Sequence, residues 1–289
     1  MDESPQARNC QSGQDARTPR KVAYPTDALP AHTFTTNTIK HLAIKHPDRE
    51  PAMPDPVTRC RARSASYQLL SIAFAHPIPE ITGQLADGRF QSAFAGHMET
   101  AFGRIPPLPR LAIDPSDFES AYIALFERGG RGRPPVPLCA GEYMQLLDGR
   151  PRPEVLLEHT RFYRHFGLKV RGHGEDNELP DHLCCQLEAM AWLGELEARA
   201  RRDRQPTEGF ERAQADFLDR LLIPFLDQFV PTLELELSRR DGDPLFAALG
   251  GATASLATWH AHEVGAALPA PPVRTLAEEP LTEEQNLWG

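Results

Sequence analysis

The chain has 289 residues, of which 40% are hydrophobic and 25% are charged, so it can bury a sizeable core. Its formal net charge of −9 argues against a nucleic-acid-binding surface, because such surfaces are basic. No apolar stretch reaches the roughly 18 residues that a membrane span needs, and no basic-then-apolar leader opens the sequence. We therefore expect a protein that stays in the cytoplasm, binds no nucleic acid and does not insert stably into a membrane.

The five cysteines do not form the pattern of a disulfide framework, since their number is odd and Cys184 and Cys185 are adjacent. A reducing compartment is the simpler setting for such a chain. Successive residues of a helix point about 100° apart, so these two thiols do not easily share one metal ion. His260 and His262 likewise fall on different faces of a helix. The sequence therefore predicts no metal site.

Three stretches of different composition divide the chain. Residues 1–55 are rich in Pro, Thr, Asp and Arg without a periodic apolar pattern, which predicts a disordered extension. Residues 56–265 carry helical apolar spacing and no run of alternating β-branched residues. Residues 266–289 have the composition of a flexible, acidic, proline-rich tail. The expected fold class is all-α, with a single globular helical domain over 56–265.

The predicted helices follow one another along the chain. A first helix runs from about Arg59 to Phe74. Asp114 precedes a proline at a first helical position, which predicts a capped helix whose apolar residues continue to Phe126. Pro224 is expected to kink or divide a later helix. The remaining helices are predicted over 153–166, 180–204, 208–238 and 244–264.

The sequence shows no motif for catalysis. The glycine-rich loop 129–135 follows a helix and lacks the Gly-Lys-Ser/Thr ending of a phosphate-binding loop, so we interpret it as a surface connection. The chain has no Gly-x-Ser-x-Gly elbow and no dinucleotide fingerprint. We therefore predict no catalytic residues and a protein that is not an enzyme.

Two segments combine apolar and polar residues in a less ordinary way. The first holds Tyr122, Leu125 and Phe126, an apolar stripe that a helix packed on a core also explains. The second holds Asp181 and His182, at the mouth of the long helix predicted from 180. Taken singly, Asp181 is better explained as a carboxylate in a first helical turn, and His182 as an exposed helical histidine.

Together these segments resemble the signature of the TorD/DmsD/NarJ family of redox-enzyme maturation chaperones. The family's first motif, an aromatic residue followed by x-x-Leu-Phe, is matched by the stripe that begins at Tyr122. Its second motif, Glu-Pro-x-Asp-His, is matched by Glu178, Asp181 and His182. The proline of that motif stands one position later here, at Pro180.

The region between the two motifs also resembles the family. The family carries a proline-containing loop that ends in a small residue and an aromatic one, which is similar to the segment 134–143 and its last residue, Tyr143. The segment 161–168 fits the helix before the second motif, so the resemblance covers about 60–235. The shifted proline looks closer to the nitrate-reductase-type branch, which includes chaperones for selenate, chlorate and dimethyl sulfide enzymes.

The resemblance implies a chaperone that binds the catalytic subunit of a molybdopterin oxidoreductase, often through its twin-arginine leader peptide, during cofactor insertion and before export. It implies that acidic side chains pair with guanidinium groups and that the apolar stripe walls a groove for the leader. It implies no resident cofactor, and it extends to transient binding of molybdopterin or a guanine nucleotide. The residues expected to contact the client are Tyr122, Leu125, Phe126, Tyr143, Glu178, Pro180, Asp181 and His182.

Two other interpretations stay open on the sequence alone. One is an all-helical enzyme that binds a cofactor or metal through His182, or through His260 and His262. The other is a structural delta subunit that stays in the mature oxidoreductase.

Overall fold

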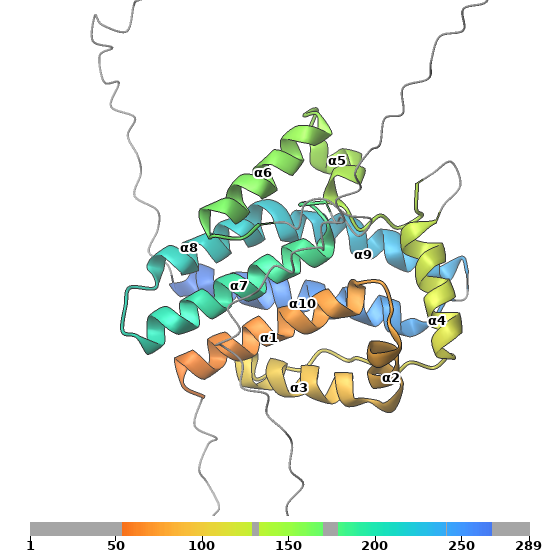
Figure 1. Cartoon of the computed structure of the whole chain (residues 1–289), viewed down its shortest axis with the longest axis horizontal. Coiled ribbons are helices and arrows are strands. Elements are labelled where there is room, and N and C mark those ends of the chain that lie inside the picture. The colour runs from red at the N-terminus through yellow and green to blue at the C-terminus, as the bar shows by residue number, and fades with distance from the viewer. Residues whose placement is uncertain (1–53, 129–132, 170–178, 241, 268–289) are drawn as a thin grey trace, which may run out of the picture. The chain divides into compact units, whose positions relative to one another are not determined.

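The computed structural model describes residues 54–128, 133–169, 179–240 and 242–267 (Figure 1). Several predicted parts lie outside the described residues: most of the expected extension and of the expected tail, the start of the glycine-rich loop, and Glu178. Within them the secondary structure is helical, and the only β-type pairing there is an isolated antiparallel bridge between Cys139 and His182. The all-α fold class is therefore confirmed for this part of the chain.

Nine helices of eight or more residues make up most of the described chain, and shorter elements join them. The longer ones are α1 Pro56–Phe74, α2 Pro79–Asp87, α3 Arg89–Phe102, α4 Pro115–Tyr122, α6 Arg152–His165, α7 Leu183–Arg202, α8 Glu208–Phe217, α9 Ile223–Ser238 and α10 Pro244–Ala267. The shorter ones are the π-helical segments η2 Ile123–Glu127 and η5 Leu218–Leu222, the 3-10 turn η4 Ala140–Glu142, and α5 Met144–Leu147. Among the described helices, none has both the length and the apolar character that crossing a membrane requires.

Aspartate followed by proline starts three of these helices, α1, α4 and α10; before α10, Asp243 accepts a hydrogen bond from the backbone N–H of Leu245. The Asp114 side chain accepts a hydrogen bond from the backbone N–H of Ser116, with a proline in the first turn of α4, as predicted. Asp55 caps α1 in the same way, accepting from Val57 and Thr58. Side-chain caps of this kind satisfy amides that have no partner within the helix, so the local sequence fixes where each helix begins.

The segment from α8 to α9 is divided at the predicted place. The π-helical segment η5 lies between the two helices, and Pro224 occupies the first turn of α9. Proline has no N–H to donate to the helical hydrogen bonds, and the wider π-helical turn accommodates the missing bond, so the chain continues as a helix. The prediction that Pro224 kinks or divides this element is confirmed.

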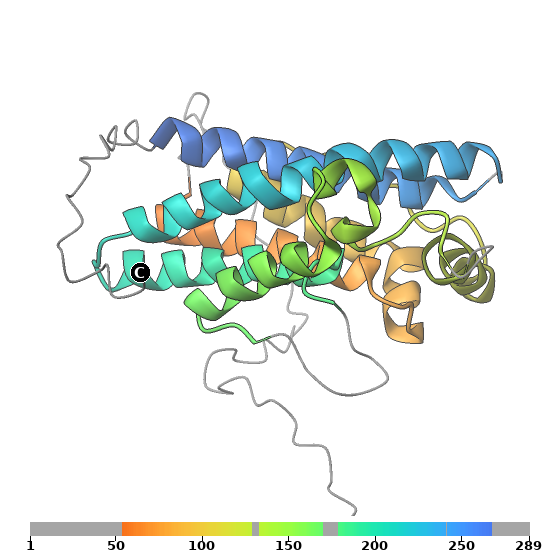
Figure 2. The ribbon, with the colours of Figure 1, turned by 90° about the horizontal axis from the view of Figure 1, so that it is seen from above.

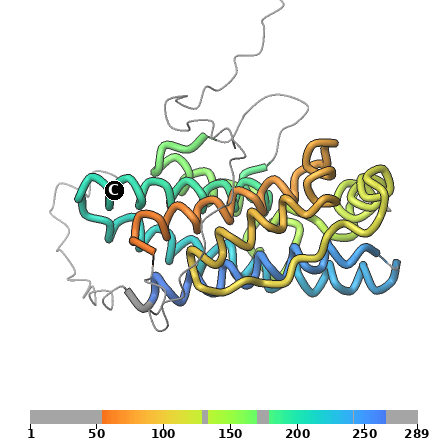
Figure 3. Tube along the Cα trace, turned by 90° about the horizontal axis from the view of Figure 1, so that it is seen from below, coloured from red at the N-terminus to blue at the C-terminus, as the bar shows by residue number. Residues whose placement is uncertain are grey.

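The long helices pack side by side around a core rich in aromatic residues. Helix α1 lies between α7 and α3, and α10 packs along α9 (Figures 1 and 2). The tube seen from below shows α3 beside α1 along most of its length (Figure 3). Phe74, Phe126, Phe229 and Phe246 meet where α1, η2, α9 and α10 approach one another. This cluster joins the two halves of the described sequence through ordinary apolar burial.

The start of α7 differs from the prediction. The helix begins at Leu183 rather than at Pro180, and His182 is its N-cap residue, with Nδ1 accepting from the backbone N–H of Cys184 at 3.3 Å. Asp181 therefore lies in the turn before the helix. The expectation of a carboxylate in the first helical turn is wrong, because the chain turns at 180–182 to pair with an earlier loop.

Candidate functional site

The segment 133–143, which we call the junction loop, connects the regions of the two motifs. Near its start, the backbone N–H of Val136 donates to the carbonyl of Leu125 at 3.0 Å. At its end, the hydroxyl of Tyr143 donates to the carbonyl of Pro137 at 3.0 Å, and the Tyr143 ring packs on Phe225 with centroids 5.6 Å apart. The loop is thus closed on itself and fastened to the first motif.

The other side of the junction loop pairs with the second motif. Across the bridge between Cys139 and His182, the Ala140 N–H donates to the Asp181 carbonyl at 3.1 Å. The Leu183 N–H donates to the Leu138 carbonyl at 2.8 Å. Because both motifs bond to the backbone of this loop, the structure links them through the loop.

Asp181 fixes the path of this loop from inside the protein. Its side chain is 0% exposed, and its Oδ2 accepts from the Gly141 N–H at 2.7 Å. A Cβ at Gly141 would lie 2.9 Å from that oxygen and 2.9 Å from Cγ of Arg152, so only glycine fits. The pairing of Asp181 with a client guanidinium group, which the family resemblance implies, stays a prediction, and it would require this buried side chain to become exposed.

The residues of the first motif form part of the core. Tyr122, Leu125 and Phe126 are 3%, 2% and 4% exposed. The Tyr122 hydroxyl donates to the carbonyl of Phe74 at 2.8 Å, which ties η2 to the end of α1. Burial of this kind leaves no face for a partner unless the helices separate. The structure therefore favours the core interpretation of the stripe, and a role in client contact stays a prediction.

The remaining predicted residues lie nearer the surface. Pro180 and His182 are partly exposed, and the carbonyl of Pro180 accepts from the hydroxyl of Tyr163 at 2.8 Å. Tyr143 is mostly buried but lines a surface depression next to the junction loop. Glu178 is not described, so its position is untested.

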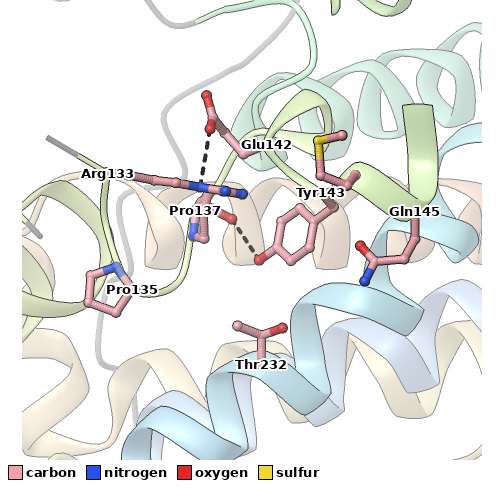
Figure 4. Close-up of a pocket in the computed structure, with 8 residues that line it drawn as sticks. Arg133, Pro135, Pro137, Glu142, Tyr143, Gln145 and Thr232 are labelled. Atoms are coloured by element: carbon pink, nitrogen blue, oxygen red, sulfur yellow. Dashed lines mark hydrogen bonds and ion pairs between the residues drawn. The ribbon is translucent and has the colours of Figure 1, made fainter. Parts of the chain in front are cut away.

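The depression has a volume of about 310 Å³ and combines apolar walls with a charged rim (Figure 4). Met144, at 72% exposure, is the most exposed of the large hydrophobic residues in the described chain. Glu142 pairs with Arg133, at 3.3 Å from Nε, and with Arg152. The lining residues are Arg133, Pro135, Pro137, Glu142, Tyr143, Met144, Gln145 and Thr232.

Of these lining residues, the sequence indicated Tyr143 as a client contact, and Pro135, Pro137 and Glu142 only as members of the segment 134–143 that resembles the family loop. Met144 and Gln145 directly follow Tyr143 in the sequence. Their position at the end of the loop motif was the signal that could have indicated them as lining residues. Thr232 lies on α9, far away in sequence, and no local pattern connects it with the loop.

His260, His262 and Cys184, which were considered for a metal or cofactor, lie in different surroundings. His260 is fully buried, with Nδ1 3.0 Å from the Tyr67 hydroxyl, and burial holds its pKa well below the ordinary value. His262 is exposed on another face of α10. The Cys184 thiol is buried and donates to the carbonyl of Ser71 at 3.3 Å. In the described ranges, no three His, Cys, Asp or Glu side chains gather in a way that could hold a metal ion.

Known proteins resemble this chain, and the family match includes the junction loop. The nitrate reductase delta subunit family matches residues 98–231. The dimethyl sulfide dehydrogenase assembly chaperone protein of Rhodovulum sulfidophilum is 38% identical over 197 residues, covering 67% of this chain and 76% of that protein. The perchlorate reductase assembly chaperone protein of Dechloromonas aromatica is 31% identical over 209 residues, covering 68% of this chain and 88% of that protein.

A third relative is the selenate reductase assembly chaperone protein of Thauera selenatis, 36% identical over 158 residues, with 55% of this chain and 76% of that protein covered. These relatives are named as assembly chaperones rather than as catalysts, in line with the expected absence of enzymatic turnover. From these matches, and from the motifs that the junction loop connects, the chain belongs to the TorD/DmsD/NarJ family of redox-enzyme maturation chaperones.

Proposed function

We propose that this protein is an assembly chaperone for the catalytic subunit of a molybdopterin oxidoreductase, acting in the cytoplasm before the client is exported. The main support is the set of relatives, whose names describe assembly chaperones for dimethyl sulfide dehydrogenase, perchlorate reductase and selenate reductase. The proposal includes no resident cofactor. It takes the client's twin-arginine leader as one of the segments bound.

We place the client contact at the depression beside the junction loop. The buried motif residues cannot meet a partner without unfolding part of the core, whereas the depression is open. Met144, Tyr143 and two prolines supply apolar area, and Glu142 with two arginines supplies charge at the rim. Exposed apolar area beside polar groups is typical of a site that binds a protein segment.

The experiment compares two exposed hydrophobic residues that differ in place. Met144→Glu puts a charge into the depression, while Ile105→Glu does the same at a 52% exposed position outside the residues that line it. Burying a methionine stabilises a complex by about 1.5–3 kcal/mol, so Met144→Glu should weaken binding roughly tenfold to a hundredfold. Ile105→Glu should leave the affinity unchanged.

Binding is measured by calorimetric titration with the catalytic subunit of a molybdopterin oxidoreductase from the same organism, with and without its leader. Equal affinities for the wild type and Met144→Glu would place the contact elsewhere. Recovery of the chain as a stoichiometric component of the active, mature oxidoreductase would instead favour the delta-subunit interpretation.

A further inference from the structure

The rim of the depression is positively charged, although the chain as a whole is acidic. Arg133 faces one oxygen of Glu142 and Arg152 faces the other, so two guanidinium groups share one carboxylate (Figure 4). The Arg133 side chain is 51% exposed, and no hydrogen bond within the described residues uses its guanidinium group. An incoming segment therefore meets an available donor at this rim rather than an available carboxylate, which favours an acidic ligand.

The next turn of α9 carries the same excess of positive charge. Glu236 follows Thr232 by four residues, so the two side chains lie on one face of the helix. Glu236 Oε1 is 2.6 Å from Nη1 of Arg239, and its Oε2 is 3.4 Å from Nε of Arg240, so again two arginines share one carboxylate. The formal net charge of the chain is −9, and this region therefore differs in sign from the protein as a whole.

The depression also offers apolar area. Met144 is 72% exposed, and Tyr143 and two prolines line the same depression. Covering the Met144 side chain removes this area from water, which is favourable. The depression thus fits a segment that carries both carboxylates and apolar side chains.

Such a segment follows α10 in this chain. Residues 276–288, which we call the acidic segment, contain four glutamates and no lysine or arginine. The same residues include Leu276, Leu281, Leu287 and Trp288. The acidic segment lies outside the described residues, and its composition complements the depression in both charge and apolar character.

The end of α10 is close enough for the acidic segment to reach the depression. A Cβ added at Gly250 of α10 would lie 3.1 Å from Leu233, the neighbour of Thr232 in the chain. From Gly250 to Ala267, where the helix ends, the α-helical rise gives about 26 Å. From Ala267 to Leu281, an extended chain covers up to about 46 Å. The difference is enough for the chain to pass around α9, whose diameter with side chains is about 10 Å.

We propose that the acidic segment binds in the depression of its own chain, with its leucines against Met144 and its glutamates at Arg133. The covalent connection to α10 raises the effective concentration of the segment, so that modest contacts are enough to hold it. A bound segment covers the surface that the client needs, and the chain then blocks its own client site until the client displaces the segment. This consequence rests on the proposed function, whereas the binding of the segment does not.

Methyl NMR of the full chain tests whether the segment occupies the depression. The chain has five methionines, and the Met144 methyl signal is assigned by its loss in Met144→Leu. The comparison is with a full-length chain, called the segment variant, that carries Glu278→Gln, Glu279→Gln, Leu281→Gln, Glu283→Gln and Glu284→Gln. The Met144 signal should shift between the wild type and the segment variant, while that of the fully buried Met98 should not. An unchanged Met144 signal would overturn the proposal, and a shift that depends on protein concentration would contradict binding within one chain and assign the segment to a second copy.

A labelled peptide of residues 276–288 tests the contacts by fluorescence anisotropy. It should bind the segment variant at least about tenfold more tightly than the wild type, whose own segment competes. In the segment variant, Arg133→Glu should weaken the peptide about tenfold or more, because it removes a charge-assisted contact. Arg161→Glu, at an exposed arginine of α6 that does not line the depression, should leave the affinity unchanged.

The two arginine variants also decide between surfaces. If Arg161→Glu weakens the peptide more than Arg133→Glu does, the segment binds α6 and the proposal is wrong. Equal affinity of the peptide for the wild type and the segment variant would show that no tethered segment competes, and would also overturn it. Neither experiment contains the client, so their failure would leave the proposed function standing.

Discussion

Replacing Phe126 by alanine separates a core role of the first motif from a client-binding role. The Phe126 ring is 4% exposed and lies 5.0 Å from Tyr122, 5.5 Å from Phe246 and 6.3 Å from Phe74, measured between ring centroids. Its removal leaves a cavity where α1, η2 and α10 meet. Substitutions of this kind cost about 3–5 kcal/mol, from lost apolar transfer and from the cavity itself.

The assay is urea unfolding at 25 °C, followed by titration of the folded variant with the client. Phe126→Ala should lower the urea midpoint with little change in slope, because the unfolded chain exposes nearly the same surface. Phe126→Leu, which keeps most of the apolar volume, should cost less than the alanine variant. Leu157→Ala, at a 44% exposed position, is the matched surface control and should change stability by less than about 0.5 kcal/mol. A Phe126→Ala chain as stable as the wild type, but unable to bind the client, would refute the core assignment.

Three further predictions concern buried groups. Gly141→Ala should destabilise the chain by about 1–3 kcal/mol in a thermal melt, because the added Cβ would lie 2.9 Å from neighbouring side chains. Gly209→Ala, whose Cβ would have nothing within 4 Å, is the control and should not destabilise the chain. The unfolding free energy should fall as the pH drops below about 6.5, by up to about 1.4 kcal/mol per pH unit for His260. The reason is that burial lowers the pKa of His260 in the folded chain, so the unfolded chain takes up the proton at a higher pH. His260→Gln should flatten that slope, and an unchanged pH profile would contradict the buried, neutral state of His260. Glu197→Gln should cost about 1–3 kcal/mol in urea unfolding, because the buried Arg63 guanidinium loses its Glu197 partner and keeps only Glu263. A loss below about 1 kcal/mol would show that water reaches the Arg63–Glu197 pair.

Local sequence signals were enough for the family and for most of the longer helices, although not for α2 and α3. They were not enough for the roles of the motif residues. Asp114 before a proline predicted a capped helix start, and Pro224 predicted a division, because both effects act within a turn of chain. Asp181 was misplaced because its partner, the Gly141 N–H, comes from a loop far away in sequence. The depression was missed for the same reason, since Thr232 reaches it only through the packing of α9.

The first motif shows how a correct match in sequence can mislead about exposure. Tyr122 and Phe126 are the right residue types at the right spacing, yet spacing alone cannot tell a stripe that faces a core from one that faces a partner. The decision depends on what packs opposite, here Phe229 and Phe246 from helices that come more than 95 residues later. Packing between segments so far apart in the chain cannot be recognised from the sequence around Tyr122 and Phe126.

Because main-chain bonds and the buried side chains of Asp181 and Tyr143 hold the junction loop, the side chains at the rim of the depression are free to change. The bonds from Val136, Ala140 and Leu183 use backbone N–H groups, which any residue except proline supplies. Mutations at Arg133, Met144 or Gln145 should therefore leave the path of the loop intact while altering what it presents. Under the proposal that the client contacts this depression, such a scaffold could acquire a new client by substitutions at a few surface positions, and the same positions would be the choice for a library that retargets the chaperone.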